Sequence, residues 1–334
     1  MLKKTLLILL AVIIGVPAAG LAYLYFRSPA MAPASGIKVS MAPERVARGQ
    51  QIFEHIGDCD GCHSGHDYTR IGLPVDRAKR GAGLVLSSII TGLPGVVVAP
   101  NLTPDPETGL GTWTDGEKIR AIREGVDREG HALFPMMPYT NYRNMSDEDA
   151  ESLVAYLNSL PPVRNPLPAT KIRFPVSLFI KTVPKPVGHV PPVDRTNRLK
   201  YGEYLVTSVS GCGGCHTPAD KGQPVPGKDF AGGQVFEAPS IGTVRSANIT
   251  PDPETGIGKW SEDFFVKKFG EYREYAVNGS PKMSGPDQFT VMPWLSFSQL
   301  PEEDLRAIYT YLRSLKPVYN AVEIHPGVPN KRTI

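Results

Sequence analysis

The longest apolar stretch of the chain runs from Thr5 to Phe26; two lysines precede it and Arg27 ends it. A signal-peptide core has roughly 7–15 apolar residues and a spanning helix needs roughly 20, so the length favours a spanning helix. The lysines place its first end on the inner side of the membrane. We therefore predict a membrane anchor over residues 1–27 and a linker over residues 28–42. A cleaved signal segment is the alternative, because the small residues at 18–20 suit a cleavage site.

Two later segments show the periodicity of amphipathic helices, with apolar side chains at positions i, i+3, i+4 and i+7. The first set is Leu153, Tyr156, Leu157 and Leu160, and the second set is Ile308, Tyr311, Leu312 and Leu315. Between such segments the chain is rich in proline, with 33 of its 334 residues, against an average of about 5%. The pattern predicts an all-α fold with short helices and long loops.

An internal repeat organises the chain beyond its N-terminal segment. The matching pairs are 101–113 with 248–260, 137–139 with 292–294, and the two helical segments above. The intervals between the blocks differ while the blocks themselves match, so we infer two copies of one domain. The predicted boundaries are 43–163 for domain 1, 164–196 for a proline-rich connector, 197–318 for domain 2 and 319–334 for a tail. The connector is apolar around residues 176–180, so we expect it to pack along one domain.

Each predicted domain contains one Cys-x-x-Cys-His motif. The motifs use all the cysteines of the chain, Cys59, Cys62, Cys212 and Cys215, and their histidines are His63 and His216. Two thiols at this spacing reach the two vinyl groups of one porphyrin, and the adjacent imidazole ligates the iron. Disulfides or a zinc site fit poorly, because zinc ribbons separate their cysteine pairs by only about 15–20 residues. The motifs predict two covalently bound haem c groups in an exported protein.

The second axial ligand of each haem is predicted from the repeat. Among the methionines and the remaining histidines, only Met137 and Met292 occupy corresponding positions in both copies. A proline follows each of them and restricts the methionine backbone to extended geometry. Ligation by His and Met raises the potential of a haem and leaves no iron position for a substrate, which favours electron transfer. The alternative is that both methionines fill gaps in the core.

Other repeated residues have less specific roles. Trp113 and Trp260 are predicted to line the haem pockets, with their indole N–H groups towards a propionate, and plain core packing is an equal alternative. Gly49 and Gly202 suit a close crossing of the first and last helices of each copy, although we favour ordinary core packing. The candidate counter-ions of the propionates are Arg120, Arg123 and Arg245.

The chain resembles bacterial class I cytochrome c domains. The strings that carry the resemblance are the two Cys-x-x-Cys-His motifs, the block 101–113, Phe134–Tyr139 and the helix start at Met145–Asp149. Closest in style are the multihaem cytochrome subunits of membrane-bound alcohol and gluconate dehydrogenases; the membrane dihaem subunit of a haem–copper oxidase is another comparison. The resemblance implies two cytochrome c domains in tandem and electron flow from a dehydrogenase subunit towards quinone or an oxidase. The chain differs in having two haem motifs where those subunits have three, and in its N-terminal apolar segment.

Together these features predict a membrane-anchored dihaem c-type cytochrome on the periplasmic side of the inner membrane. It is expected to pass single electrons between exported or membrane redox proteins: a dehydrogenase subunit, other cytochromes or a terminal oxidase. No catalytic residue is predicted. Lys plus Arg number 36 and Asp plus Glu number 33, with no basic stripe, so no nucleic-acid partner is expected. The alternative is a dihaem peroxidase with one open haem, for which His66 and His131 are the suggestive extra residues.

Overall fold

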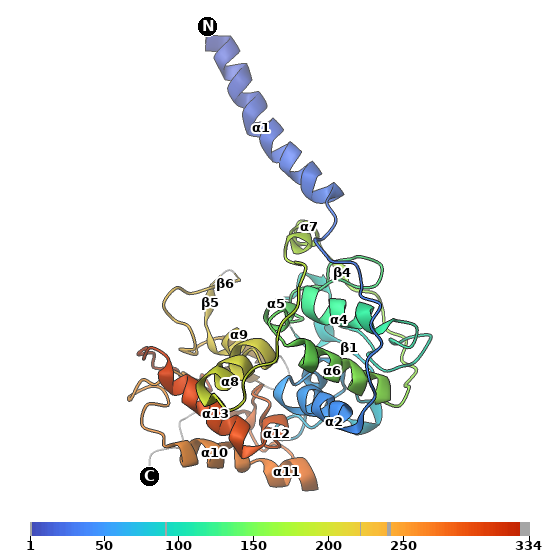
Figure 1. The fold of residues 1–334 in the computed structure, drawn as a ribbon. Coiled ribbons are helices and arrows are strands. Elements are labelled where there is room, and N and C mark those ends of the chain that lie inside the picture. The colour runs from blue at the N-terminus through green and yellow to red at the C-terminus, as the bar shows by residue number, and fades with distance from the viewer. Residues whose placement is uncertain (1, 91, 221, 239–241, 328–334) are drawn as a thin grey trace.

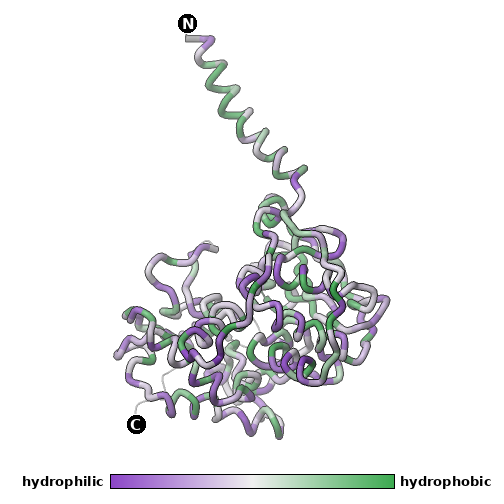
Figure 2. Tube along the Cα trace, in the orientation of Figure 1, coloured by the Kyte–Doolittle hydropathy of each residue, from purple (hydrophilic) through white to green (hydrophobic). Residues whose placement is uncertain are grey.

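The computed structural model describes residues 2–90, 92–220, 222–238 and 242–327. A single long helix, α1 (Leu2–Phe26), projects from a body made of two similar halves (Figure 1). Most of the residues of α1 are hydrophobic (Figure 2), and the helix is long and apolar enough to cross a membrane. Met1 of the predicted anchor and residues 328–334 of the predicted tail lie outside the described residues.

Domain 1 is the half of the body that follows α1. Its helices are α2 (Pro43–Gln51), η1 (Ile52–Ile56), α3 (Asp60–His63), η2 (Arg77–Lys79), η3 (Leu86–Ser88), α4 (Asp115–Glu124), α5 (Tyr139–Tyr142) and α6 (Asp147–Ser159). Local sequence sets several of their ends. Thr114 and Glu117 form a capping box at the start of α4, and Gly125 ends it with a φ of 76°. Ser146 caps α6 by accepting a hydrogen bond from the Asp149 N–H.

Domain 2 repeats this order. Its helices are α8 (Arg198–Tyr204), η5 (Leu205–Val209), α9 (Cys212–His216), α10 (Glu262–Gly270), α11 (Arg273–Asn278), η6 (Pro286–Gln288), α12 (Trp294–Phe297) and α13 (Glu302–Ser314). The counterparts of α2, η1 and α3 are α8, η5 and α9, and those of α4, α5 and α6 are α10, α12 and α13. The first and last helices cross in the same way in both halves, α2 with α6 and α8 with α13, whereas α5 packs on α4 in domain 1 and α12 packs on α11 in domain 2.

A glycine permits the closest helix crossing in each domain. A Cβ atom at Gly49 would lie 1.8 Å from the Ser152 carbonyl oxygen, and one at Gly202 would lie 1.9 Å from the Ala307 carbonyl oxygen. No side chain fits at such distances, so α2 meets α6, and α8 meets α13, backbone against backbone. The interpretation of these glycines as ordinary core residues is therefore wrong, and the close-crossing alternative is correct.

The expectation of an all-α fold holds only in part, since the described residues also contain four antiparallel two-stranded pairs. The pairs are β1 (Leu84–Val85) with β3 (Val98–Ala99), β2 (Gly95–Val96) with β4 (Lys171–Ile172), β5 (Ala219–Asp220) with β6 (Gln223–Pro224), and β7 (Val235–Ala238) with β8 (Gly242–Arg245). All lie in the long loops between helices. Extended loop segments pair there because each needs partners for its backbone N–H and C=O groups.

The connector packs along domain 1. Its strand β4 pairs with β2 of that domain, and it then forms α7 (Val176–Phe179) and η4 (Ile180–Thr182). Further along, the Val187 N–H donates to Glu124, and His189 contacts the Asp147 carboxylate at 2.6 Å. The connector therefore belongs structurally to domain 1, as its apolar segment predicts.

The two domains share one hydrophobic core and meet with approximate twofold symmetry. Helix α5 of domain 1 packs on η5 of domain 2, and α12 of domain 2 packs on η1 of domain 1. The Asn141 amide donates to the Thr207 carbonyl at 2.9 Å, and the Ser296 hydroxyl donates to the Asp58 carboxylate at 2.8 Å. Asn141 and Ser296 follow Met137 and Met292 by the same number of residues, so the repeat itself creates the junction.

A buried carboxylate reinforces this junction. Asp149 of domain 1 accepts hydrogen bonds from Arg48 at 2.8 Å and from the hydroxyl of Tyr204, in domain 2, at 2.7 Å. Burial alone would raise the pKa of Asp149, but the Arg48 guanidinium and the Tyr204 hydroxyl outweigh it and hold that pKa below the usual value. The carboxylate therefore stays ionised and links the first and last helices of domain 1 to the first helix of domain 2.

Candidate functional site

The two motif histidines are buried and oriented in the same way. His63 Nδ1 lies 2.9 Å from the Pro100 carbonyl oxygen, and His216 Nδ1 lies 2.7 Å from the Ala247 carbonyl oxygen. A carbonyl oxygen can only accept, so each Nδ1 carries the proton and each Nε2 keeps its lone pair. Burial lowers the pKa of both imidazoles, which keeps them neutral. A neutral imidazole with a free Nε2 is the form that ligates a metal.

The turn before each motif is a feature that sequence reasoning misses. In both domains the first helix ends in one π turn, in which the Gly57 N–H bonds to the Ile52 carbonyl, and the Ser210 N–H bonds to the Leu205 carbonyl. Such π turns often occur at functional sites, because they rotate the side chains that follow. Asp58 and Gly211 then adopt left-handed φ values of 45° and 63°, directly before the first cysteine of each motif. The only sequence signal is the matching position of these two residues.

The cysteines are placed to hold a haem at the domain junction. Cys59 and Cys212 pack against the shared core, whereas Cys62 and Cys215 are exposed. The Cys62 thiol lies near Asp58 and near Cys215 of the other motif. The exposed second cysteines of the two motifs therefore lie near each other at the junction. Two thiols one helical turn apart, followed by an imidazole with a free Nε2, fit covalent haem on both sides.

The Met-Pro strings form identical turns. Pro138 has φ −81° and ψ 43°, and Pro293 has φ −77° and ψ 60°. Both are close to an inverse γ-turn, and the Met137 and Met292 carbonyls accept hydrogen bonds from the second residue that follows. The two methionines are half-buried beside the shared core. The backbone therefore has a similar conformation at both methionines. The role of their side chains as axial ligands stays a prediction.

The two tryptophans pack against the hydrophobic core. Both Trp113 and Trp260 are half-buried and pack against the core. Trp260 contacts the rings of Phe264 and Phe265, with centroid distances of 5.0 Å and 6.4 Å. These contacts agree with the core-packing alternative, and the proposed reach towards a propionate stays a prediction.

The repeated Thr-Pro-Asp-Pro-Glu-Thr-Gly segment is a rigid loop that joins the haem site to the last helix. The Asn101 amide donates to Thr108 at 3.0 Å and to the Val163 carbonyl, just beyond α6, at 2.7 Å. Asp105 accepts from the backbone and hydroxyl of Thr108, both at 2.7 Å. Domain 2 repeats each of these bonds. Since Asn101 directly follows Pro100, the loop fixes the carbonyl that orients His63.

The extra residues considered for a peroxidase have structural or surface roles. His66 has both ring nitrogens close to backbone carbonyls, at 2.6 Å from Leu73 and 3.1 Å from Asp60. The His131 side chain is 76% exposed and lies beside Asp127. Neither is therefore placed as a free acid or base at a haem. The candidate propionate counter-ions are also engaged elsewhere: Arg120 bonds a backbone carbonyl, Arg123 bonds Asp147, and Arg245 lies 3.8 Å from Glu323.

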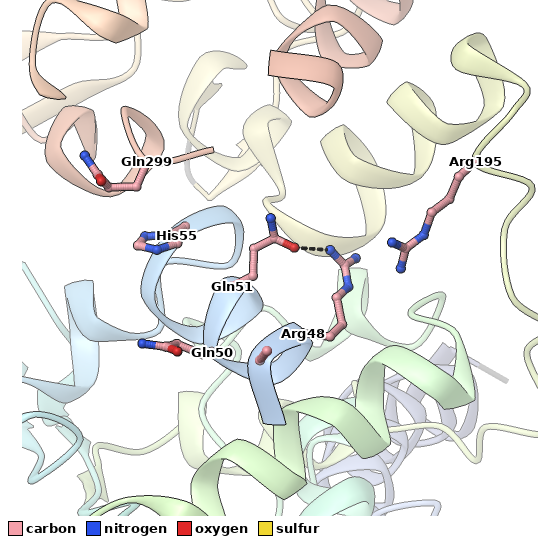
Figure 3. Close-up of a pocket in the computed structure, with 7 residues that line it drawn as sticks. Arg48, Gln50, Gln51, His55, Arg195 and Gln299 are labelled. Atoms are coloured by element: carbon pink, nitrogen blue, oxygen red, sulfur yellow. Dashed lines mark hydrogen bonds between the residues drawn. The ribbon is translucent and has the colours of Figure 1, made fainter. Parts of the chain in front are cut away.

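A polar groove lies at the domain junction away from the motifs. Its lining residues are Ala47, Arg48, Gln50, Gln51, His55, Arg195 and Gln299. Figure 3 shows the Arg48 guanidinium bonded to Gln51, a contact of 2.9 Å. Arg48 is also held by Asp149, so its charge is already balanced. None of the predicted haem residues is in this lining, and the groove is therefore not the haem site.

Comparison with known proteins agrees with this geometry. The family model described as "Cytochrome c" matches the chain twice, over residues 46–161 and 200–316. The cytochrome c subunit of the quinone alcohol dehydrogenase of Gluconacetobacter polyoxogenes is 31% identical over 88% of this chain and 61% of its own length. The fructose dehydrogenase cytochrome subunit of Gluconobacter japonicus is 31% identical over 81% of this chain and 52% of its own length.

One relative has nearly the same extent as this chain. The diheme cytochrome c-type protein of Cereibacter sphaeroides is 31% identical over 82% of this chain and 86% of its own length. By contrast, the chain spans only about half to three-fifths of the two dehydrogenase subunits. The similarity therefore extends across both halves of the chain and their connection.

Proposed function

Because the chain belongs to the cytochrome c family and carries two covalently bound haem c groups, we propose that it is a membrane-anchored electron carrier. It passes single electrons between redox proteins on the outer side of the inner membrane. The observation that carries the proposal is the pair of matching sites. Each has a neutral, buried histidine with a free Nε2 and a Met-Pro turn of the same geometry.

The residues of the chain hold the two haems and set their reduction potentials. The cysteine pairs would hold the porphyrins through thioethers, and His63 and His216 would ligate the irons. Each haem supplies the one-electron Fe(III)/Fe(II) couple. Met137 and Met292 would hold the irons through their thioethers, so the protein would control the potential through ligands, burial and nearby charge, and not through bond chemistry at the iron.

The junction between the domains supports electron transfer between the two sites of one molecule. The motifs lie near each other at Cys62 and Cys215, and the helices that follow the two methionines bind across the junction. This rigid contact keeps the relation between the two sites fixed. Covalent bonds and hydrogen bonds therefore connect the two sites, and an electron that enters at one site can pass to the other.

Two observations support the proposed membrane location and the proposed partners. Helix α1 is long and apolar enough to span a bilayer. Several relatives are named as cytochrome subunits of alcohol, fructose or gluconate dehydrogenases. We therefore propose an uncleaved anchor with periplasmic haem domains, and a dehydrogenase subunit as electron donor. Other cytochromes or a terminal oxidase are the proposed acceptors.

The test is carbon monoxide binding to the reduced protein, followed by absorption spectroscopy. We expect no change in the wild type and a partial shift in Met137→Ala or Met292→Ala, each opening one haem. The potential of that haem should fall by on the order of 0.1 V, within the range of about 0.8 V that axial ligands span. Met136→Ala is the matched control, because its side chain packs in a separate small cluster, and should change nothing.

Two results would contradict the proposal in different ways. If Met137→Ala or Met292→Ala left both haems insensitive to carbon monoxide, that methionine would not be a ligand. If the wild type itself shifted in part, one iron would be open and the peroxidase alternative would replace the carrier. The positions of His66 and His131 argue against that alternative.

A further inference from the structure

The connector folds against the end of α1 that faces the haem domains. The Lys181 ammonium donates to the Tyr25 carbonyl at 2.8 Å and lies 5.9 Å above the Tyr25 ring. Figure 1 shows α7 beside this end of α1, on the side of domain 1. The connector therefore lies where the proposed membrane helix leaves the bilayer.

This part of the connector exposes large aromatic side chains. Phe174 is 70% exposed and Phe179 is 52% exposed, although Leu178 between them is 7% exposed and fixes α7 to the protein. Aromatic residues Tyr23 and Tyr25 are also exposed at the end of α1. Exposed phenylalanines in a soluble environment are unfavourable, whereas the interface of a bilayer accommodates such rings.

The same segment has charge of one sign. Between Glu151 and Asp194 the sequence contains five cations and no carboxylate residue. The cations are Arg164, Lys171, Arg173, Lys181 and Lys185. Lys171 and Lys185 are exposed, and their long aliphatic stems let the ammonium groups reach phosphates while the rings enter the interface. Arg164 is paired with Glu107, so the positive charge that the segment offers lies on Arg173 and the three lysines.

We propose that a membrane-contact patch, made of Phe174, Phe179, Lys171, Lys181 and Lys185, rests on an anionic lipid bilayer. The inference rests on the proposed anchor and deepens it, because the patch is a second contact beside α1. A single spanning helix leaves the attached domains free to tilt, whereas a second contact fixes which surface faces the lipid. Domain 1, to which the connector is joined by β2 and β4, is then held next to the membrane.

The experiment uses the full-length haem-loaded protein in lipid nanodiscs that contain a photoreactive lipid and phosphatidylglycerol. After illumination, labelled peptides are identified by mass spectrometry. We expect labels in α1 and in residues 171–185. Phe174→Ser with Phe179→Ser should reduce labelling of the connector about tenfold and leave α1 labelling unchanged. Phe264→Ser, at a ring that is 46% exposed in domain 2, is the matched control.

The charge contribution is tested separately. Lys185→Ala should lower connector labelling about fivefold, since each cation near an anionic surface contributes about 1 kcal/mol, and nanodiscs of phosphatidylcholine alone, which remove the contribution of all three lysines, should lower it further. Higher salt should act in the same direction on the connector but not on α1, whose insertion is apolar. Haem absorption and thermal unfolding of each variant establish that it is folded.

The outcomes distinguish the patch from the anchor. Labels in α1 without labels in residues 171–185 would overturn the membrane-contact patch and leave the anchor standing. Labels in neither would overturn both. Connector labelling that is equal in neutral and anionic lipid would overturn the electrostatic part and with it the proposal of an anionic bilayer. Chemical cross-linking of the patch to a co-purified acidic protein in place of lipid would also contradict it.

Discussion

In domain 1 the residue before the first haem-binding cysteine is Asp58, and in domain 2 it is Gly211. Both have a left-handed backbone, which glycine adopts freely and aspartate tolerates better than most residues. Two positions later, Asp60 in domain 1 corresponds to Gly213 in domain 2. The backbone requirement is therefore the same in both copies, while the charge differs. A repeat of this kind duplicates the scaffold of a haem site and lets its electrostatics diverge.

The charges in domain 1 are only partly balanced. Arg80 lies 2.8 Å from Asp60 and 2.6 Å from Glu54, so one guanidinium serves two carboxylates. Asp58 has a neutral hydroxyl, Ser296, as its partner. Negative charge favours the ferric over the ferrous haem, because ferric iron carries one more positive charge. We therefore expect the haem of domain 1 to have the lower reduction potential of the two.

The largest expected effect concerns the glycine at the helix crossing, which both domains share. Gly49→Ala and Gly202→Ala should each lower the free energy of unfolding by about 3 kcal/mol or more, since the added methyl group meets a backbone oxygen. Chemical denaturation of the holoprotein measures this. Gly270→Ala, with nothing within 4 Å of its Cβ, is the control and should be neutral or stabilising. Tolerance of alanine at either crossing would contradict the close packing.

The next prediction concerns the residue before the first cysteine of each motif, which is exchanged between the two domains. Asp58→Gly should raise the potential of the domain 1 haem, and Gly211→Asp should lower that of the domain 2 haem. We expect each shift to be close to the 59 mV that corresponds to about tenfold in a one-electron equilibrium. Spectroelectrochemical titration resolves the two haems. Shifts of equal size at both haems for either variant would show that the carboxylate acts on the whole molecule.

A smaller effect concerns the junction. Asn141→Ala and Ser296→Ala each remove one hydrogen bond between the domains, which should cost about 1 kcal/mol. Because the domains share one hydrophobic core, the wild type should unfold in a single transition. Calorimetry of the holoprotein tests both points. Two separate transitions in the wild type would mean that the shared core does not couple the domains.

The smallest effect is a pH dependence limited to domain 1. Burial raises the pKa of Asp58 to about 7, against the opposing effect of the hydrogen bond from Ser296. The carboxyl is neutral below that pH and ionised above it, so the potential of the domain 1 haem should fall as the pH rises through 7. The change should not exceed that of Asp58→Gly, and Asp58→Asn should abolish it. An equal slope at the haem of domain 2 would show that the Asp58 carboxylate acts on both haems, and a slope that survives Asp58→Asn would point to another group.

Local patterns predict much of this molecule. The spacing of the cysteines and histidines, the helical periodicity and the duplicated blocks each depend on neighbouring residues, and the family comparison confirms two cytochrome c domains. The apolar segment of the connector likewise predicts that it packs on a domain. The structure adds four strand pairs to the helices, because strand pairing depends on which loops meet and leaves little trace in short segments.

The remaining features depend on contacts between distant segments. Nothing near His63 in the sequence indicates that the Pro100 carbonyl fixes its tautomer, or that Asn101 holds that loop to the end of α6. The role of Gly49 is likewise visible only when Ser152 is placed opposite it. These contacts join residues separated by dozens of positions, so no local pattern records them.

The sequence by itself determined the chemistry of the chain, since two Cys-x-x-Cys-His motifs in a duplicated domain specify two covalent haems wherever they lie. Only the tertiary structure decided how the copies are used. It brings Cys62 near Cys215, makes Asp58 part of the junction with Ser296, and binds the connector to the end of α1. The physical reason is that covalent attachment needs only neighbouring side chains, whereas orientation, burial and charge around a haem arise from packing between segments far apart in the chain.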